Sequence, residues 1–340
     1  MRASFSGISR PFLLIALFVA VGGVQLASAQ SPNEAGTVSV GGGDALTIGG
    51  LLQTDAYLGR ADNDGFRVRS TRLRFGGNAE SLQYAVQTDF ASSSILLDAF
   101  ARLPLTDQLR MTAGIFKTPF SAEILTPRPN LLFAERARVV NNVAPNRQAG
   151  VSLARTLVPD RLTATVGAFN GTSGLQPPSS DPLLYVGRLS GRLPVSTGEL
   201  ELGTNAAYSI DDDTPLSGLG RPAFSGTRVL FGADARLDID RWLLAGELDT
   251  AWLDPNGGAD TANPFGFYVA AGADVSENQQ VLIRFDQYDP DTPIQATPED
   301  QLTLGYNYDY SSLLRFLVNY QAATDDVGDG FFTARLQVAL

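Results

Sequence analysis

The 340-residue sequence contains no cysteine and no histidine, and it has a single lysine, Lys117, beside 24 arginines. Disulfide frameworks, Cys or His metal sites, and Ser-His-Asp or Cys-His nucleophilic mechanisms all require the missing residue types. No remaining side chain titrates near neutral pH without a strong shift, so a general acid or base would have to be a tuned carboxyl group, a tyrosine or Lys117. The composition therefore argues against an enzyme, and we expect neither a cofactor nor a bound metal.

The formal net charge of -11 is unevenly distributed along the chain. Residues 60–160 contain thirteen bases and nine acids, a net charge of +4, whereas residues 161–340 contain ten bases and twenty-four acids, a net charge of -14. An acidic protein is a poor nucleic-acid binder, because affinity for nucleic acid comes from neutralising phosphates with a basic surface. We therefore expect no nucleic-acid partner, but a locally positive region lies within the acidic chain.

The first 29 residues have the pattern of a secretory signal peptide. Two arginines precede a short apolar run over residues 11–21, and Ala27-Ser28-Ala29 supplies the small residues of a cleavage site. The alternative is a membrane anchor, but the run is shorter than the roughly 20 residues of a spanning helix. We expect export, cleavage after Ala29, a periplasmic lead-in over residues 30–43, and an outer-membrane domain over residues 44–340.

Beyond this segment, apolar and polar residues alternate with a period of two over stretches of about ten residues, separated by Gly, Pro, Asn, Asp and Ser. Tight connections alternate mostly with long ones, which is typical of an outer-membrane barrel with an even number of strands. The predicted fold class is therefore all-β, a transmembrane antiparallel β-barrel of about 16 strands. The strands are expected near residues 45–58, 66–77, 81–90, 94–103, 108–117, 148–157, 161–170, 182–193, 199–210, 227–238, 241–253, 265–275, 279–289, 300–310, 312–322 and 331–340.

Both tryptophans, Trp242 and Trp252, lie ten residues apart on one face of the same predicted strand. At roughly 3.3 Å per residue and a tilt near 40°, ten residues climb about 25 Å, the height of the apolar band between the two aromatic girdles of such a barrel. In a soluble β-sandwich, the alternative, the polar face of this strand would have to meet bulk water. We therefore predict that both side chains lie at membrane interfaces. At sixteen strands the lumen is too wide for side chains to fill, so the protein should conduct solutes.

Four separated sequence elements between residues 66 and 153 form a recognisable pattern. Residues 66–75 read FRVRSTRLRF, residues 114–123 read GIFKTPFSAE, Glu135-Arg136 follows, and residues 144–151 read APNRQAGV. This pattern resembles the phosphate-selective porin O and P family, in which an arginine-rich second strand and a strand ending in G-x-F-K-x-P-F precede a long third loop. The resemblance implies a homotrimer of 16-stranded barrels in the outer membrane, with the third loop, residues 118–147, folded into the lumen as a constriction that selects anions.

The family resemblance carries one difference in composition. Members that select phosphate strongly line the pore with lysines, whereas this chain has one lysine and 24 arginines. Arginine holds phosphate firmly through two parallel hydrogen bonds, while a conducting site must also release its ion. The composition therefore favours a preference for anions in general over strict selectivity for phosphate.

Four cations lie on one predicted strand: Arg67, Arg69, Arg72 and Arg74. Strict alternation would divide them between the two faces, so a β-bulge near Ser70-Thr71 is needed to turn all four inward. An arginine facing lipid at mid-membrane costs about 2–4 kcal/mol, which favours the lumen for all of them. They either guide anions or pair with carboxylates such as Glu80, Asp89 and Asp98.

A second group of cations belongs to the predicted third loop. It consists of Arg128, Arg136, Arg138 and Arg147, with Lys117 just before the loop. The acids of the loop are Glu123 and Glu135, so a loop inside the lumen would form a net positive constriction, and fixed charge at close quarters sets ion preference. The alternative is that Arg136 and Arg147 only pin the loop to the barrel wall.

Acidic segments at residues 211–213, 254–260, 289–291 and 325–326 resemble fragments of calcium loops, but none has the complete twelve-residue spacing. All fall in expected external loops, so we expect solvated loop charge there. The sequence as a whole predicts an outer-membrane porin, a passive diffusion channel for small hydrophilic solutes with a preference for phosphate-like anions. A non-selective or cation-preferring porin is the first alternative, and a barrel enzyme or an adhesin is the second.

Overall fold

The computed structural model describes residues 46–60, 64–172, 183–258, 260–291 and 299–340. The predicted signal peptide and lead-in, residues 1–43, lie outside the described residues. Among the residues that are described, no helix is both long enough and apolar enough to cross a membrane.

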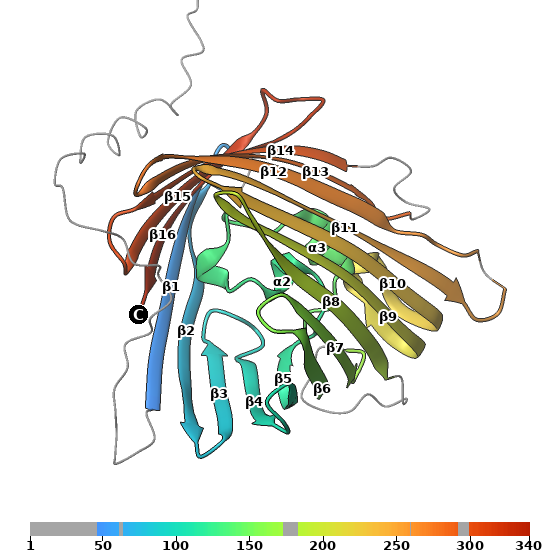
Figure 1. Ribbon diagram of the computed structural model, residues 1–340. Helices are drawn as coiled ribbons and strands as arrows, with labels where there is room; N and C mark the ends of the chain where they lie inside the picture. The colour runs from blue at the N-terminus through green and yellow to red at the C-terminus, as the bar shows by residue number, and fades with distance from the viewer. Residues whose placement is uncertain (1–45, 61–63, 173–182, 259, 292–298) are drawn as a thin grey trace, which may run out of the picture.

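The described chain forms a closed barrel in which consecutive strands pair in antiparallel fashion and β1 pairs with β16 (Figure 1). The prediction of an all-β barrel with sixteen strands is thereby confirmed. The strands are β1 (Leu46–Leu58), β2 (Gly65–Ala79), β3 (Leu82–Asp89), β4 (Leu96–Pro104), β5 (Leu109–Lys117), β6 (Arg147–Val158), β7 (Leu162–Phe169), β8 (Leu184–Val195), β9 (Gly198–Leu216), β10 (Arg221–Ile239), β11 (Trp242–Pro255), β12 (Phe265–Ser276), β13 (Gln279–Asp289), β14 (Glu299–Asp309), β15 (Leu314–Ala323) and β16 (Phe331–Ala339).

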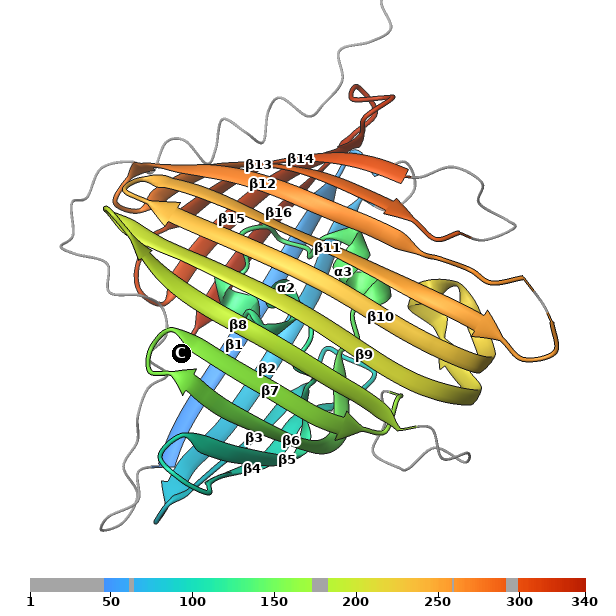
Figure 2. The same cartoon turned by 45° about the vertical axis from the view of Figure 1, so that its right-hand side comes forward.

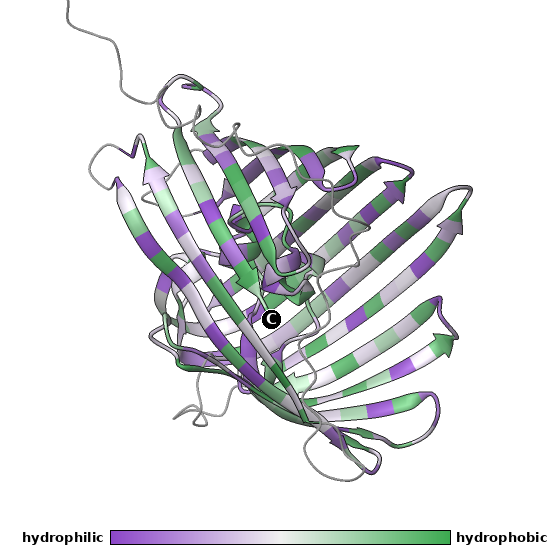
Figure 3. Ribbon diagram, turned by 90° about the vertical axis from the view of Figure 1, so that its left-hand side faces the viewer, coloured by the Kyte–Doolittle hydropathy of each residue, from purple (hydrophilic) through white to green (hydrophobic). Residues whose placement is uncertain are grey.

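The barrel wall separates an apolar outer face from a polar lumen, because successive side chains of a strand point to opposite sides. In β11, Trp242 and Trp252 are 56% and 58% exposed on the outer face, whereas Glu247 and Asp249 are buried on the inner face. Figure 3 shows this alternation of apolar and polar residues along the strands. Hydrocarbon cannot hydrogen-bond an open sheet edge, so a sheet with such an outer face has to close.

The connection between β9 and β10 differs from the sequence-based prediction. Each of the two strands has 19 residues, and only the short 3-10 segment η3 (Ser217–Leu219) joins them among the described residues. The prediction of a long external loop over residues 211–226 is therefore wrong. Asp211, expected as solvated loop charge, is buried on the inner face and paired with Arg228 at 2.9 Å. The strand pairing continues past this point because the ion pair satisfies the inward-facing charges.

The connection between β5 and β6, residues 118–146, is here called the L3 segment, and it lies inside the barrel (Figures 1 and 2). It contains α2 (Ala122–Leu125), η2 (Arg128–Asn130) and α3 (Arg138–Val143). Burying a large apolar side chain contributes about 1.5–3 kcal/mol, so the L3 segment is a packed part of the protein and not a loose loop. Its buried apolar residues, which pack against inward-facing wall residues such as Phe169 and Leu253, include Phe120, Ile124, Phe133, Val139, Val140 and Val143.

Candidate pore constriction

A buried ion network fixes the middle of the L3 segment to the barrel wall. Glu135 accepts hydrogen bonds from Arg69 of β2 at 2.8 and 3.0 Å and from Arg335 of β16 at 3.3 Å. Arg335 also pairs with Asp55 of β1 at 2.6 Å. Burial opposes the ionisation of Glu135, but the hydrogen bonds and charge of Arg69 and the charge of Arg335 outweigh it and lower the pKa of Glu135 to about 2. Glu135 is therefore ionised and ties the L3 segment to both strands that flank β1.

Two further bonds seat the helices of the L3 segment on the wall. The backbone amide of Glu123 in α2 donates to Glu247 of β11 at 3.1 Å. The amide of Arg138, the first residue of α3, donates to Asp286 of β13 at 3.0 Å. The first turn of a helix has unpaired amides, so a carboxylate placed there satisfies one of them. The L3 segment thus crosses the lumen from β2 and β16 to the wall formed by β11 to β13.

All four arginines predicted on the second strand face the lumen: Arg67, Arg69, Arg72 and Arg74. The register of β2 against β1 shifts between Val68 and Ser70, so Arg69 is the extra residue of a β-bulge. Arg67 then lies opposite Asp55, and Arg74 lies opposite Gly49, on the inner face. The bulge predicted near Ser70-Thr71 is confirmed, with its extra residue directly before that dipeptide.

Six cations from β2, from the L3 segment and from the strand ends beside it gather in one region, here called the basic band. Its members are Arg69, Arg72, Lys117, Arg128, Arg136 and Arg147. Acids neutralise three of them, in the pairs Arg69–Glu135 at 2.8 Å, Arg72–Asp89 at 3.0 Å and Arg147–Asp98 at 2.8 Å. Half of the basic band therefore consists of balanced ion pairs, of which Arg69–Glu135 joins the wall to the L3 segment and the other two join wall strands to each other.

Lys117 and Arg136 form no ion pair with an acid within the described ranges. The ammonium group of Lys117 donates to the carbonyls of Leu125 and Thr126 at 3.2 and 2.9 Å. Arg136 donates to the carbonyls of Glu123 and Thr126 at 2.9 and 3.2 Å. The two side chains thus bind the backbone of α2 and its C-terminal flank, and the charge of Arg136 keeps no ion-paired counter-charge.

Arg128 of η2 is the second unbalanced cation of the basic band. It is buried, and it forms no ion pair with any acid that the structure describes. Burial, together with the positive charges of Arg69 and Arg72, lowers the pKa of Arg128 to about 9. This direction is expected where a cation is desolvated among other cations. Arg128 still carries its charge at neutral pH.

Arg138 lies apart from the other loop cations. It begins α3, which packs against β11, β12 and β13, and its guanidinium group forms an ion pair with Glu299 of β14. The sequence grouped Arg138 with Arg128 and Arg136 because the three are close in the chain. The side chain of Arg136 turns back to the carbonyls of Glu123 and Thr126, whereas that of Arg138 points to Glu299 on the wall.

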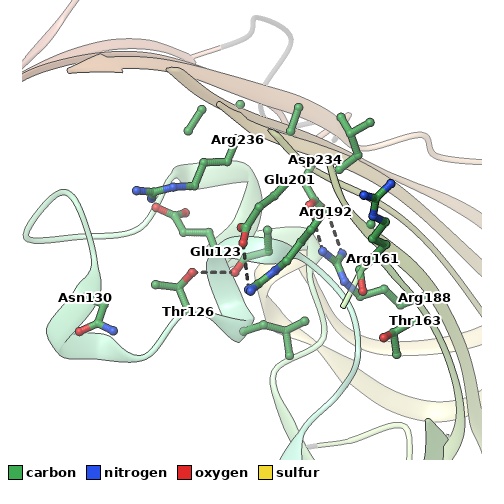
Figure 4. A pocket seen from close by; sticks show the side chains of 18 of the residues that line it. Glu123, Thr126, Asn130, Arg161, Thr163, Arg188, Arg192, Glu201, Asp234 and Arg236 are labelled. Carbon is green, nitrogen blue, oxygen red and sulfur yellow. Dashed lines mark hydrogen bonds and ion pairs between the residues drawn. The ribbon is translucent and has the colours of Figure 1, made fainter. Parts of the chain in front are cut away.

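A cavity of about 930 Å³ lies between the L3 segment and the wall from β6 to β12 (Figure 4). The turn residues Gln108 and Asp160 line it, so it lies on the side of the short turns. Two ion pairs belong to its charged lining, Arg188–Asp234 at 2.7 Å and Arg192–Glu201 at 2.9 Å. The sequence analysis did not single out these four residues, although the strand period could have placed them on the lumen face. In the part of the chain that is described, no three His, Cys, Asp or Glu side chains form a group able to hold a metal ion.

The barrel matches solved structures of outer-membrane proteins over most of its length. For an anion-selective porin from Comamonas acidovorans, the TM-score is 0.62 at 14% identity, covering 88% of this chain and 100% of that chain. For OmpT of Vibrio cholerae in its trimer form, the TM-score is 0.64 at 12% identity, with 87% and 99% covered. For the channel DcaP of Acinetobacter baumannii, it is 0.63 at 12% identity, with 89% and 99% covered. No curated protein matches the chain in sequence.

The closed sixteen-stranded barrel with a charged lumen defines a porin, a passive channel through which solutes diffuse. The family model described as phosphate-selective porin O and P matches residues 50–214. This match supports the family that the motifs between residues 66 and 153 predicted.

Proposed function

We propose that this porin prefers small anions and that the basic band selects them where the L3 segment narrows the lumen. The observation that carries the proposal is that Arg128 and Arg136, the two cations of the basic band inside the L3 segment, have no ion-pair partner among the described acids. Fixed charge close to a permeating ion determines which sign of ion passes. Exposed charges further away than about 8 Å are largely screened at physiological ionic strength, so the acidic excess elsewhere counts for less.

The remaining candidate cations have two supporting roles. Arg67 and Arg74 line β2 on either side of the basic band, and neither forms an ion pair with a described acid, so they guide anions along the wall. Arg69, Arg72 and Arg147 position the constriction through their ion pairs. Both guanidinium and ammonium groups bind oxyanions, so phosphate-like ions belong to the permeant class. The anion-selective porin from Comamonas acidovorans supports the proposal, because the same fold carries this selectivity there.

Single-channel recording in planar bilayers under a KCl gradient tests the proposal. We expect a reversal potential of anion sign for the wild-type channel. The double variant R128Q/R136Q should lower the ratio of chloride to potassium permeability several-fold, because it removes two unbalanced charges from the basic band. The matched control is R236Q, because Arg236 also lines the lumen but pairs with Asp238 at 2.7 Å and lies outside the basic band.

A reversal potential of cation sign in the wild-type channel would overturn the proposal in favour of a non-selective or cation-preferring porin. The net charge of -14 over residues 161–340 is the observation that favours this second candidate. An equal effect of R128Q/R136Q and R236Q would show that overall charge, and not the basic band, sets the preference. If R67Q/R74Q alone changed selectivity, β2 would be the selector.

We also propose that the protein is exported by the signal peptide over residues 1–29 and works as a homotrimer in the outer membrane. Trp242 and Trp252, exposed on the outer face of β11, support the membrane setting as interfacial aromatics at its two boundaries. The trimer form of OmpT supports the oligomeric state. Disappearance of the trimer band on heating in semi-native electrophoresis would be the expected result.

A further inference from the structure

Two buried carboxyl groups lie in the wall beneath α2 without a cation to balance them. Glu247 and Asp249 are neighbours on the inner face of β11 and are 3% and 0% exposed. Neither forms an ion pair with a base that the structure describes. One oxygen of Glu247 and both oxygens of Asp249 also lack a hydrogen-bond partner. Two adjacent carboxylates left this way would be strongly unfavourable, because desolvation and mutual repulsion both oppose ionisation.

The surroundings of the pair offer no counter-charge. The titratable and charged groups that face it are Arg188 of β8, Asp234 of β10, Tyr268 of β12 and Glu123 of the L3 segment. Arg188 is the cation of this set, and it is held by both oxygens of Asp234 at 2.7 and 2.9 Å. The other facing groups are acids or neutral. Glu247 and Asp249 must therefore lower their joint charge by another means.

The neutral side chain of Asn205 points toward Asp249. The amide nitrogen of Asn205 on β9 is buried without a hydrogen-bond partner. A Cβ atom at Gly232 of β10 would lie 2.3 Å from an Asp249 oxygen and 2.9 Å from this nitrogen, so both groups reach the point that the glycine leaves open. A buried donor without an acceptor is as costly as the reverse, so this amide needs an acceptor oxygen at that point.

We propose that Glu247 and Asp249 form a proton-binding site that holds one proton, shared between the free oxygen of Glu247 and an oxygen of Asp249. The two carboxyl groups lie within hydrogen-bonding reach of each other. The second oxygen of Asp249 then accepts from Asn205. The proton thus gives a partner to the free oxygen of Glu247 and to one oxygen of Asp249, and the bond from Asn205 satisfies the other two unsatisfied atoms of the cluster. The pair keeps one negative charge, which the amide of Glu123 that donates to Glu247 at 3.1 Å helps to stabilise.

This proton site couples the charge of the wall to the position of the L3 segment. Glu247 is the group on which α2 is seated, and Lys117 and Arg136 of the basic band are bonded to the carbonyls at the far end of α2. Removal of the proton in alkaline solution would place two negative charges in contact directly beneath Glu123. The resulting repulsion should loosen α2 and add negative charge to the lumen, so anion preference should fall.

Infrared spectroscopy of the folded full-length barrel tests the proton directly. The wild-type protein in neutral buffer should show the carbonyl stretch of a protonated carboxyl group, which shifts in D₂O and disappears in alkaline buffer. D249N should remove this band. The matched control is D286N, because Asp286 is an equally buried wall carboxyl that touches the L3 segment but is paired with Arg284 at 3.2 Å. It should leave the band in place.

An absent band in the wild-type protein, or a band that persists in D249N, would overturn the proposal. Asparagine reproduces the proposed hydrogen bonds of protonated Asp249, so D249N should fold as the wild-type protein does. Its failure to fold would also contradict the proposal.

The functional consequence rests on the proposed anion preference and has a separate readout. The wild-type ratio of chloride to potassium permeability should fall several-fold from neutral to alkaline buffer, whereas D249N should keep its neutral-pH value. An alkaline loss of equal size in both proteins would refute the coupling. If the wild-type channel had no anion preference, the proposed function would fail, while the infrared measurement would still decide whether the proton is present.

Discussion

Replacing Glu135 with glutamine should detach the middle of the L3 segment from the barrel wall by removing one charge. Because the pKa of Glu135 is about 2 and its ordinary value is 4.5, the ionised group stabilises the folded state by about 3 kcal/mol at neutral pH. The side chain is 31% exposed, so screening by water reduces this figure to about 2 kcal/mol. Arg335 keeps its partner Asp55 in the variant, so Arg69 alone loses its ion pair.

The pH dependence gives this prediction a specific sign. The pKa of Glu135 is lower in the folded state than in the unfolded chain, so its contribution is complete above pH 4.5 and disappears as the pH falls toward about 2. Urea titration of the barrel in detergent, followed by the fluorescence of the two tryptophans, measures the free energy of unfolding. The difference between wild-type and E135Q should be about 2 kcal/mol at neutral pH and should vanish near pH 2.

A difference that stays constant between neutral pH and pH 2 would refute the reasoning, because it would show that the shape of the side chain matters and its charge does not. The matched control is E201Q. Glu201 pairs with Arg192 at 2.9 Å, but the two side chains are 38% and 63% exposed. An exposed pair contributes about 0–1 kcal/mol, so E201Q should change the free energy of unfolding little.

Two further predictions use the same urea titration. G114A should destabilise the barrel by about 1–3 kcal/mol, because Gly114 has a φ of 127° and a Cβ atom there would lie 2.1 Å from the carbonyl oxygen of Ala99. G187A on the outer face is its control, since nothing lies within 4 Å of that Cβ position, and equal effects of the two substitutions would contradict the steric explanation. R228Q should cost about 3–5 kcal/mol because it leaves Asp211 buried without its cation, and a loss below 1 kcal/mol would show that water replaces the pair.

The barrel could be predicted from the sequence because its determinants are local. Alternation with a period of two continues along each strand and records, residue by residue, which side chain faces lipid and which faces the lumen. The inward turn of the β2 arginines followed from the same rule, since charge on the lipid face is costly and a bulge is the simplest way to avoid it. The predicted end of the strand at residue 210 was wrong because acidic residues such as Asp211 are typical of turns. The buried partner of Asp211, Arg228, lies 17 residues away, so no local pattern reveals it.

The arrangement inside the lumen could not be predicted in the same way, because it depends on contacts between distant parts of the chain. Glu135 finds Arg69 across 66 residues and Arg335 across 200 residues. Glu123 meets Glu247 across 124 residues. No local pattern encodes such pairings. The sequence therefore identified the cations of the third loop, but it could not show which of them have ion-pair partners or that Arg138 lies elsewhere.

The ion network around Glu135 can be completed only after the barrel has closed. One of its arginines, Arg335, belongs to the last strand, and its partner Asp55 belongs to the first, so both are in place only after β16 has paired with β1. Arg335 additionally donates to the carbonyl of Ala134 in the L3 segment. An open sheet of fifteen strands would lack Arg335 and therefore its hydrogen bonds to Ala134 and Glu135 of the L3 segment. Closure of the barrel therefore completes the attachment of the L3 segment to the wall.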